Sequence, residues 1–309
     1  MTAASELLSA IEQNPGDDLA WLALADCLEE SGRDREAELV RLREWLRFAD
    51  LLHPERRSKE RRLQALIAEG ARPPGPVTAL PLPHGSTMRL ALVPPGTFWM
   101  GSPEGDPDRY DDEVPRHRVR LTNGFWVGVC PVTQSQWHAV TGVRASNYSG
   151  EERPVDQASW RECQRFCERL ADFTWRSVRL PTEAEWEYAC RAGTTSRFYS
   201  GDDEQSLAAA AWYQQNSNGE PRPVGKKLPN AWGLHDLLGG VWEWCSDSQR
   251  DYGDGRLVVD PVGEEGGLRV VRGGSIRNDT RATRCAHRGI DSLDSHLGPL
   301  GCRVVIDLG

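Results

Sequence analysis

The stretch RLPTEAEWEYACRAG, residues 179–193, carries a clear signal for local structure. Thr182 is followed three residues later by Glu185, a spacing typical of the capping box that begins a helix. Apolar and aromatic residues then recur at helical spacing, and they include Trp186 and Tyr188. We therefore expect a helix over residues 182–192 whose first turn is capped by its own side chains.

The part of the chain around this helix, residues 88–309, predicts an α+β domain with much irregular structure. A second helix is indicated over residues 154–170. Ten of the 12 tryptophans fall in this part, and buried aromatics of this kind hold loop-rich domains together. Short apolar runs bounded by Gly, Pro or Asn predict strands at 90–93, 119–121, 125–129 and 269–271.

Residues 1–71 have a different character and predict a small all-helical domain. Apolar residues at helical spacing, interrupted by turn residues, indicate three or four helices, the second capped by Asp17 or Asp18. The basic residues 53–62 are expected on the solvated face of the last helix, with a partner-binding patch as the alternative. Residues 72–87 contain five prolines and predict a stiff, extended linker between the two domains.

Composition excludes a membrane protein and a mostly disordered chain. The chain of 309 residues is 39% hydrophobic and 27% charged, which is typical of a globular protein with a sizeable core. The first residues, MTAASELLSAIEQ, are unlike a secretory signal, and no apolar run reaches the length of a membrane span. A net charge of -9 argues against a nucleic-acid partner. We expect a cytoplasmic monomer with no membrane or nucleic-acid partner.

The eight cysteines do not form a metal-binding pattern. None lies in a CxxC pair, and no pair of histidines stands near Cys163 and Cys167, which share one face of the predicted helix. We expect buried, reduced thiols.

Seven motifs in the second domain carry a resemblance to a known family. From residue 90 onward the chain resembles the formylglycine-generating enzymes, also called the sulfatase-modifying factor domain. This resemblance implies a C-type-lectin-like fold. The motifs are VPPGTFWMGS (93–102), DDEVPRHRV (111–119), PVTQSQW (131–137), RLPTEAEWEYACRAG (179–193), GLHDLLGGVWEW (233–244), RGGS (272–275) and GCRVV (301–305).

The motif GGVWEW allows two interpretations. Strand alternation places its two tryptophans on one side and Glu243 on the other, which indicates a core segment with an exposed acid. The resemblance instead implies calcium, bound by the Asp236 and Glu243 side chains and the Gly239 and Val241 carbonyls, since calcium prefers oxygen ligands. The family usually has Asn where Gly240 stands.

Catalytic residues of the family are missing from this chain. The resemblance implies two cysteines in the loop after RGGS, whose thiolates bind copper, a soft ion that Asn, Thr or Asp cannot hold. Residues 276–283 contain no cysteine, so we expect no copper. The ergothioneine-type branch of the family resembles an iron enzyme whose three histidines come from an N-terminal helical bundle, and the helical domain here contains only His53. We interpret the chain as non-catalytic; a formylglycine-generating oxidase and a lone reactive thiol at Cys285 beside His287 are the alternatives.

The segment 276–303 is also similar to the variable proteins of diversity-generating retroelements. Their adenine-directed mutagenesis rewrites AAC or AAT codons and cannot produce Glu, Lys, Gln, Met or Trp, and this segment contains none of the five. A surface loop that drifted after catalysis was lost is the alternative. Around fixed residues Arg284, Ala286 and Arg288, the candidate variable positions are Arg277, Asn278, Asp279, Arg281, Ala282, His287, Gly289, Ile290, Asp291, Ser292, Ser295, His296, Leu297, Gly298 and Pro299.

These observations favour a binding function. Loops of mixed polar and apolar residues on a fixed scaffold suit ligand recognition, so we expect these loops to bind a protein or other macromolecule. Residues 7–43 resemble the repeat-companion domain of planctomycetes and related bacteria, which favours an interaction protein. A regulatory or structural domain without a ligand at this loop pair is the third possibility.

Overall fold

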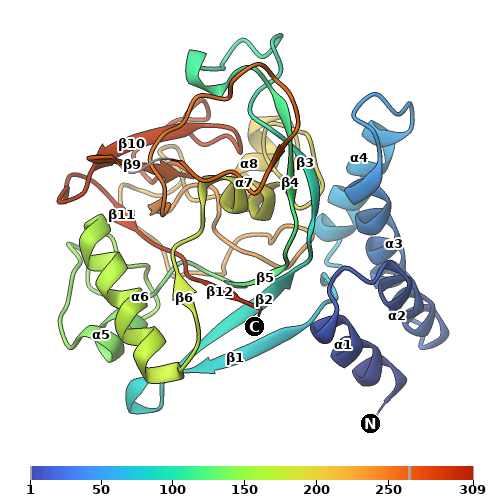
Figure 1. Ribbon diagram of the computed structural model, residues 1–309, viewed down its shortest axis with the longest axis horizontal. Coiled ribbons are helices and arrows are strands. Elements are labelled where there is room, and N and C mark those ends of the chain that lie inside the picture. The colour runs from blue at the N-terminus through green and yellow to red at the C-terminus, as the bar shows by residue number, and fades with distance from the viewer. Residues whose placement is uncertain (1, 264–265, 309) are drawn as a thin grey trace.

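A computed structural model describes residues 2–263 and 266–308 of the chain. Four helices occupy the N-terminal part, as the sequence predicts: α1 (Ala3–Gln13), α2 (Asp18–Glu30), α3 (Asp34–Phe48) and α4 (Arg56–Ala68). They stand together on one side of a larger domain that contains all the strands (Figure 1). Asp17 caps α2, because its carboxylate accepts hydrogen bonds from the Leu19 and Ala20 amides at 3.0 and 3.2 Å.

The larger domain is built on three sheets, which confirms the predicted α+β class. A five-stranded antiparallel sheet has the order β1-β2-β5-β12-β6, so the C-terminal strand lies inside the sheet that the domain's first strands begin. Its strands are β1 (Val77–Pro81), β2 (Thr87–Val93), β5 (Phe125–Gly128), β12 (Val305–Asp307) and β6 (Val178–Arg179).

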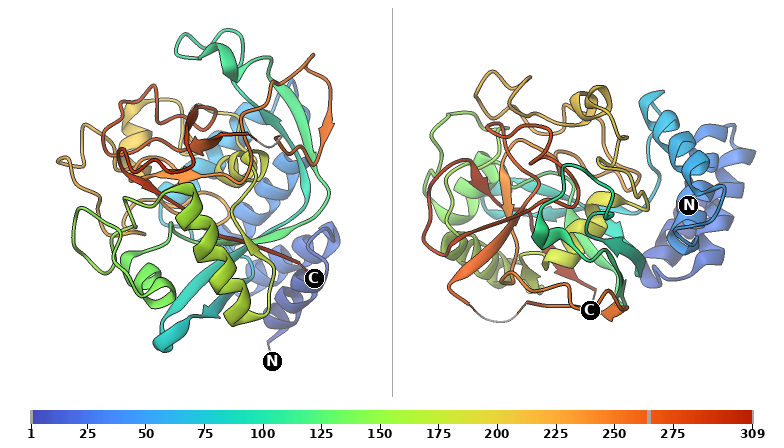
Figure 2. Two further views of the ribbon diagram at one scale, coloured as in Figure 1. Left: turned by 60° about the vertical axis from the view of Figure 1, so that its left-hand side comes forward. Right: turned by 90° about the horizontal axis from the view of Figure 1, so that it is seen from above.

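Two smaller sheets complete the architecture (Figure 2). One has the order β3-β4-β8, with β3 (Gly96–Met100), β4 (His117–Leu121) and β8 (Val258–Val259). The other has the order β10-β9-β7-β11 and places β10 at an edge. Its strands are β10 (Arg288–Ser292), β9 (Leu268–Arg272), β7 (Trp242–Trp244) and β11 (Leu300–Gly301).

Capping boxes begin three of the four helices in this domain. The helices are α5 (Gln134–Thr141), α6 (Trp160–Thr174), α7 (Glu183–Arg191) and α8 (Glu204–Ala210). The box predicted at Thr182 and Glu185 is confirmed at the start of α7. The helix predicted over residues 154–170 begins later, because Ser159 forms the cap of α6 with Glu162.

The predicted linker is partly a strand. Residues 77–81 form β1 and pair with β2, which corrects the expectation of an extended linker throughout residues 72–87. The core is also continuous across the two parts of the chain, since Leu46 and Leu66 belong to the same apolar cluster as Tyr188. Among the described residues, none of the helices is both long enough and apolar enough to span a bilayer.

Candidate functional site

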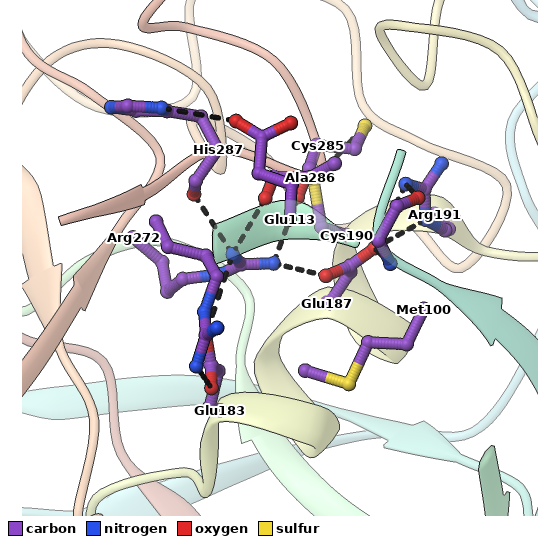
Figure 3. Close-up of polar contacts among 12 residues, drawn as sticks. Met100, Glu113, Glu183, Glu187, Cys190, Arg191, Arg272, Cys285, Ala286 and His287 are labelled. Atoms are coloured by element: carbon purple, nitrogen blue, oxygen red, sulfur yellow. Dashed lines mark hydrogen bonds and ion pairs between the residues drawn. The ribbon is translucent and has the colours of Figure 1, made fainter. Parts of the chain in front are cut away.

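A buried network of charges lies beneath the segment that carries the candidate variable positions (Figure 3). Arg272, at the end of β9, donates hydrogen bonds to the backbone carbonyls of Cys285, Ala286 and His287 at 2.9 to 3.0 Å. Its guanidinium also pairs with the fully buried Glu187. Arg272 therefore clamps three consecutive carbonyls, and the chain enters β10 in a defined position.

Two arginines within the segment, Arg284 and Arg288, pair with buried carboxylates. Arg288 makes a bidentate pair with Glu183 at 2.6 and 2.8 Å, and Arg284 makes one with Glu113 at 2.7 Å for both contacts. These arginines and carboxylates are all nearly inaccessible to solvent. Arg284 and Arg288, which the sequence analysis treats as fixed, therefore point into the domain and not toward the solvent.

Glu113 is held in its ionised form by these partners. Burial alone would raise its pKa, but hydrogen bonds from His287 and Arg284, together with the charge of Arg284, lower the pKa of Glu113 to about 2. His287 Nδ1 lies 3.4 Å from Glu113 Oε1. Glu113 thus connects the loop before β4 to the segment that precedes β10.

The loop after Gly273-Gly274-Ser275 has a fixed backbone and exposed side chains. The Ile276 amide donates to the Gly240 carbonyl at 3.1 Å, and the Gln214 amide donates to the Asn278 carbonyl at 3.0 Å. Asp279 Oδ1 accepts from the amides of Arg281 and Ala282 and closes the turn. The side chains of Arg277, Asp279 and Arg281 are exposed.

An aromatic surface continues from this loop. The Arg281 guanidinium lies 4.0 Å from the centre of the Tyr110 ring, and His287 packs between Tyr110 and Trp242 at centroid distances of 4.8 and 5.5 Å. We did not identify Tyr110 and Trp242 from the sequence. Gly289 adjoins them, since a Cβ at this position would lie 3.3 Å from the Trp242 ring.

Among the later candidate variable positions, His296 lies beside α6. His296 Nε2 is 2.8 Å from a Glu162 carboxylate oxygen, and Ser295 Oγ donates to Asp291 at 2.9 Å. Ile290 on the edge strand β10 is 45% exposed, and Leu297 is 86% exposed.

The structure divides the candidate variable positions by burial. Ala282, His287, Ser295 and Pro299 are buried, so their side chains do not form an open surface. Asn278, Gly289, Asp291 and Gly298 are half-buried. The exposed positions are Arg277, Asp279, Arg281, Ile290, Ser292, His296 and Leu297, which we call the exposed loop set.

The thiols do not fit a copper site. Cys285 is fully buried, and its Sγ lies 3.6 Å from Sγ of Cys190 in the core. Burial raises the pKa of the Cys190 thiol well above its usual range. Residues 276–283 have no cysteine, so the loop itself supplies no thiolate pair. His287 faces Glu113 instead of a thiol, so no imidazole stands beside Cys285 as a base. Burial would raise the pKa of the Cys285 thiol, but the hydrogen bond from Cys190 and the charge of Arg191 lower it.

Glu243 is not the exposed acid that strand alternation indicated. It is 1% exposed, and both of its oxygens accept hydrogen bonds from Arg303, at 2.8 and 3.0 Å, while Trp186 Nε1 donates at 2.8 Å. Arg303 lies 60 residues further along the chain, so the local pattern around Glu243 does not reveal this partner. A carboxylate neutralised in this way does not fit a calcium ligand.

Asp236, the other carboxylate predicted to bind calcium, has only one of its two oxygens in a hydrogen bond. Asp236 Oδ2 accepts from the Gly225 amide, whereas its Oδ1 is buried with no hydrogen-bond partner in the described chain. Burial raises the pKa of this carboxyl. The described residues contain no group of three or more His, Cys, Asp or Glu side chains arranged to hold a metal.

We expect calcium to have no effect on stability. Because Arg303 already occupies Glu243, the melting temperature should be the same in millimolar calcium chloride and in EDTA. Thermal unfolding monitored by circular dichroism measures this, with magnesium chloride as the control for ionic strength. A calcium-specific rise that is lost in the Asp236→Asn variant would instead establish the cation site predicted from the sequence.

Comparison with known proteins identifies relatives of the larger domain. A family model described as a sulfatase-modifying factor enzyme 1-like domain matches residues 79–308. The chain is 33% identical over 207 residues to the formylglycine-generating enzyme of Mus musculus, covering 62% of the chain and 53% of that enzyme. It is 32% identical over 284 residues to the hercynine oxygenase of Mycolicibacterium smegmatis, covering 74% and 64%. The chain spans about half the length of the mammalian enzymes it matches.

Two solved structures resemble the fold over nearly their whole length. Treponema denticola variable protein 1 superimposes with a TM-score of 0.69 and 26% identity, covering 75% of this chain and 99% of that protein. PvdO from Pseudomonas aeruginosa gives the same TM-score and identity, covering 77% of this chain and all of that protein.

Proposed function

The chain belongs to the sulfatase-modifying factor family and shares its C-type-lectin-like fold, and from this premise we propose that it is a non-catalytic binding protein. Its ligand, a protein or other macromolecule, would contact the exposed loop set. One observation carries the proposal: the loop that follows Gly273-Gly274-Ser275 presents exposed side chains on an anchored backbone and contains no cysteine.

The buried charges support this proposal energetically. Arg272, Arg284 and Arg288 bind the backbone or buried carboxylates, and none of these contacts uses a side chain of the exposed loop set. Substitutions of exposed side chains away from structural contacts usually change stability by about 0.5 kcal/mol or less. Arg277, Ile290, Ser292 and Leu297 make no side-chain hydrogen bond with the described residues and can vary at this low cost. Asp279, Arg281 and His296 do make such bonds, so their substitution costs more. The resemblance to Treponema denticola variable protein 1 is consistent with a variable surface.

We expect natural sequence variation to occur at exposed positions of the segment and not at buried ones. Sequencing of the gene's 3′ end across isolates should show substitutions at the exposed loop set, in codons derived from AAC or AAT. Ala282, His287 and Ser295 should stay constant, because their side chains are buried and that of His287 also contacts Glu113. Exposed residues of α6, such as Arg165 and Asp172, serve as the comparison for ordinary surface drift. Equal variation at α6 and at the loops would rule out a diversified surface.

The alternative function is oxidation of a substrate cysteine to formylglycine. The identity to enzymes of that name favours it. The purified protein would be incubated with a CxPxR peptide, copper and oxygen, and the peptide mass would be compared with that produced by a competent enzyme. We expect no change in mass, because no thiolate pair is available beside the loop. Conversion of the peptide would overturn the binding proposal in favour of catalysis.

A further inference from the structure

A cavity of about 710 Å³ lies between α4 and the larger domain. One wall comes from α4, with Arg57 and Arg61, and the facing wall includes the loop after β3 and Arg116 at the start of β4. Leu51, Leu52 and Pro103 add apolar surface. Cavities of about 300–1,000 Å³ are the usual size for small-molecule sites.

The charge of this cavity is opposite to that of the chain. Seven arginines and three carboxylates line it, although the whole chain carries a net charge of -9. Several of these arginines have structural partners: Arg56 binds Glu60, Arg191 binds Glu187 and Arg284 binds Glu113. The excess positive charge therefore resides on the arginines that have no such partner.

Arg116 is the clearest of these unpartnered arginines. Its Nε and Nη2 are buried and have no hydrogen-bond partner in the part of the chain that the structure describes. Burial, together with the charge of Arg191, lowers the pKa of Arg116 to about 9. The charges of Glu187 and Glu60 act on Arg116 from nearby, but neither carboxylate accepts a hydrogen bond from its Nε or Nη2. A guanidinium removed from water without hydrogen-bond partners is costly, and such groups in folded proteins are normally paired.

The α4 wall supplies further positive charge. Arg57 and Arg61 are exposed, four residues apart, and neither forms an ion pair with the described residues. Like charges at this spacing repel each other slightly. Most of residues 53–62 are exposed, as expected for a solvated face, but Arg56 and Glu60 are buried against the larger domain, where they contact Gly193 and Thr195. Arg57 and Arg61 thus line the cavity while their side chains remain exposed to solvent.

We propose that this interdomain cavity binds a small organic anion, whose phosphate or carboxylate oxygens pair with Arg116 and are approached from α4 by Arg57 and Arg61. A guanidinium offers two parallel N–H donors, and both oxyanions accept them in a bidentate manner. The cavity is larger than an inorganic ion needs, and its leucine and proline surface suits the remainder of an organic molecule. The site lies outside the exposed loop set and does not depend on the proposed function.

The test uses pyrophosphate and citrate as separate probes of the two oxyanion types. Each is titrated into the full-length protein by calorimetry, with sodium chloride at matched ionic strength, and melting temperatures are recorded. We expect at least one probe to bind and to raise the melting temperature. The probe that binds more tightly identifies the phosphate or the carboxylate as the preferred group. If neither binds beyond the sodium chloride control, the proposal is wrong.

Arg116→Met should weaken binding of the probe and raise the melting temperature of the free protein. It should weaken binding about tenfold or more, because a charge-assisted pair is lost. Without a probe it should raise the melting temperature, since it removes a buried charge that has no partner. A merely structural arginine would lower the melting temperature on removal and leave binding unchanged, and that result would overturn the assignment.

Variants on α4 keep the proposal testable if Arg116→Met does not fold. The double variant Arg57→Gln/Arg61→Gln should bind the probe more weakly with an unchanged fold, because both side chains are exposed. Arg62→Gln is the matched control: Arg62 is an exposed arginine on the same helix, but it pairs with Glu38 and does not line the cavity. Equal loss of binding in the double variant and the control would mean nonspecific attraction and would refute the site.

Discussion

Replacing Arg303 with methionine is expected to lower the free energy of unfolding by about 3–5 kcal/mol, because a buried charge then has no partner. Arg303 and Glu243 are each 1% exposed and share two contacts of 2.8 and 3.0 Å. The same guanidinium donates to the carbonyls of Gly128 and His235. The substitution removes all of these bonds and leaves the Glu243 carboxylate buried with only the Trp186 indole as a donor.

Urea unfolding of the wild type and the variant measures this loss. Arg179→Met is the matched control, because Arg179 also pairs with two carboxylates, Glu185 and Asp307, but its side chain is 31% exposed. The control should lose about 1 kcal/mol or less. Adding Glu243→Leu to Arg303→Met should recover part of the stability, since no charge then remains unpaired. Equal, small losses in both arginine variants would contradict the importance of burial.

Glu113→Gln is expected to cost about 3 kcal/mol at neutral pH, and the cost should disappear in acid. The pKa of Glu113 is about 2 in the folded protein, against an ordinary value of 4.5. Such a shift corresponds to roughly 3 kcal/mol in favour of the ionised form. Because the folded pKa is lowered, this stabilisation is fully present above about pH 4.5 and is lost as the pH falls through about 2.

Unfolding free energies at a series of pH values between 7 and 2 test this prediction. The difference between wild type and Glu113→Gln should shrink below about pH 4.5 and approach zero near pH 2. Asp111→Asn provides the control, because Asp111 belongs to the same short helical turn but its side chain is fully exposed. A difference that stays constant across the pH range would show that ionisation of Glu113 is not the source of its stabilisation.

Local features of the fold were predictable from the sequence. The capping box at Thr182, the cap at Asp17 and the strands at 90–93 and 125–129 depend on residues close together in the chain, and all of them are present. The boundary of α6 was wrong because Ser159 was not recognised as a cap. Residues 77–81 were assigned to a linker because the prolines in and around them obscured a strand that forms only beside β2.

Partners distant in the chain were not predictable in this way. Glu243 was expected to be exposed, since alternation along a strand does not reveal that Arg303 covers its other face. His287 was expected to vary on a surface, yet it packs against Glu113 from a loop 174 residues earlier. Tyr110 and Trp242 reach the same place from two other segments, which is why neither was recognised as part of the candidate site.

The sequence alone determined the class of fold, the family motifs and the missing cysteines, because these depend on residue identity and short spacing. Only the tertiary structure decided which charges are paired, which loop positions face solvent and that Nε and Nη2 of Arg116 are buried without a hydrogen-bond partner among the described residues. The physical reason is that electrostatic and packing energies depend on distance in space. In this protein the decisive contacts, such as Glu113 with Arg284 and Glu183 with Arg288, join residues more than one hundred positions apart.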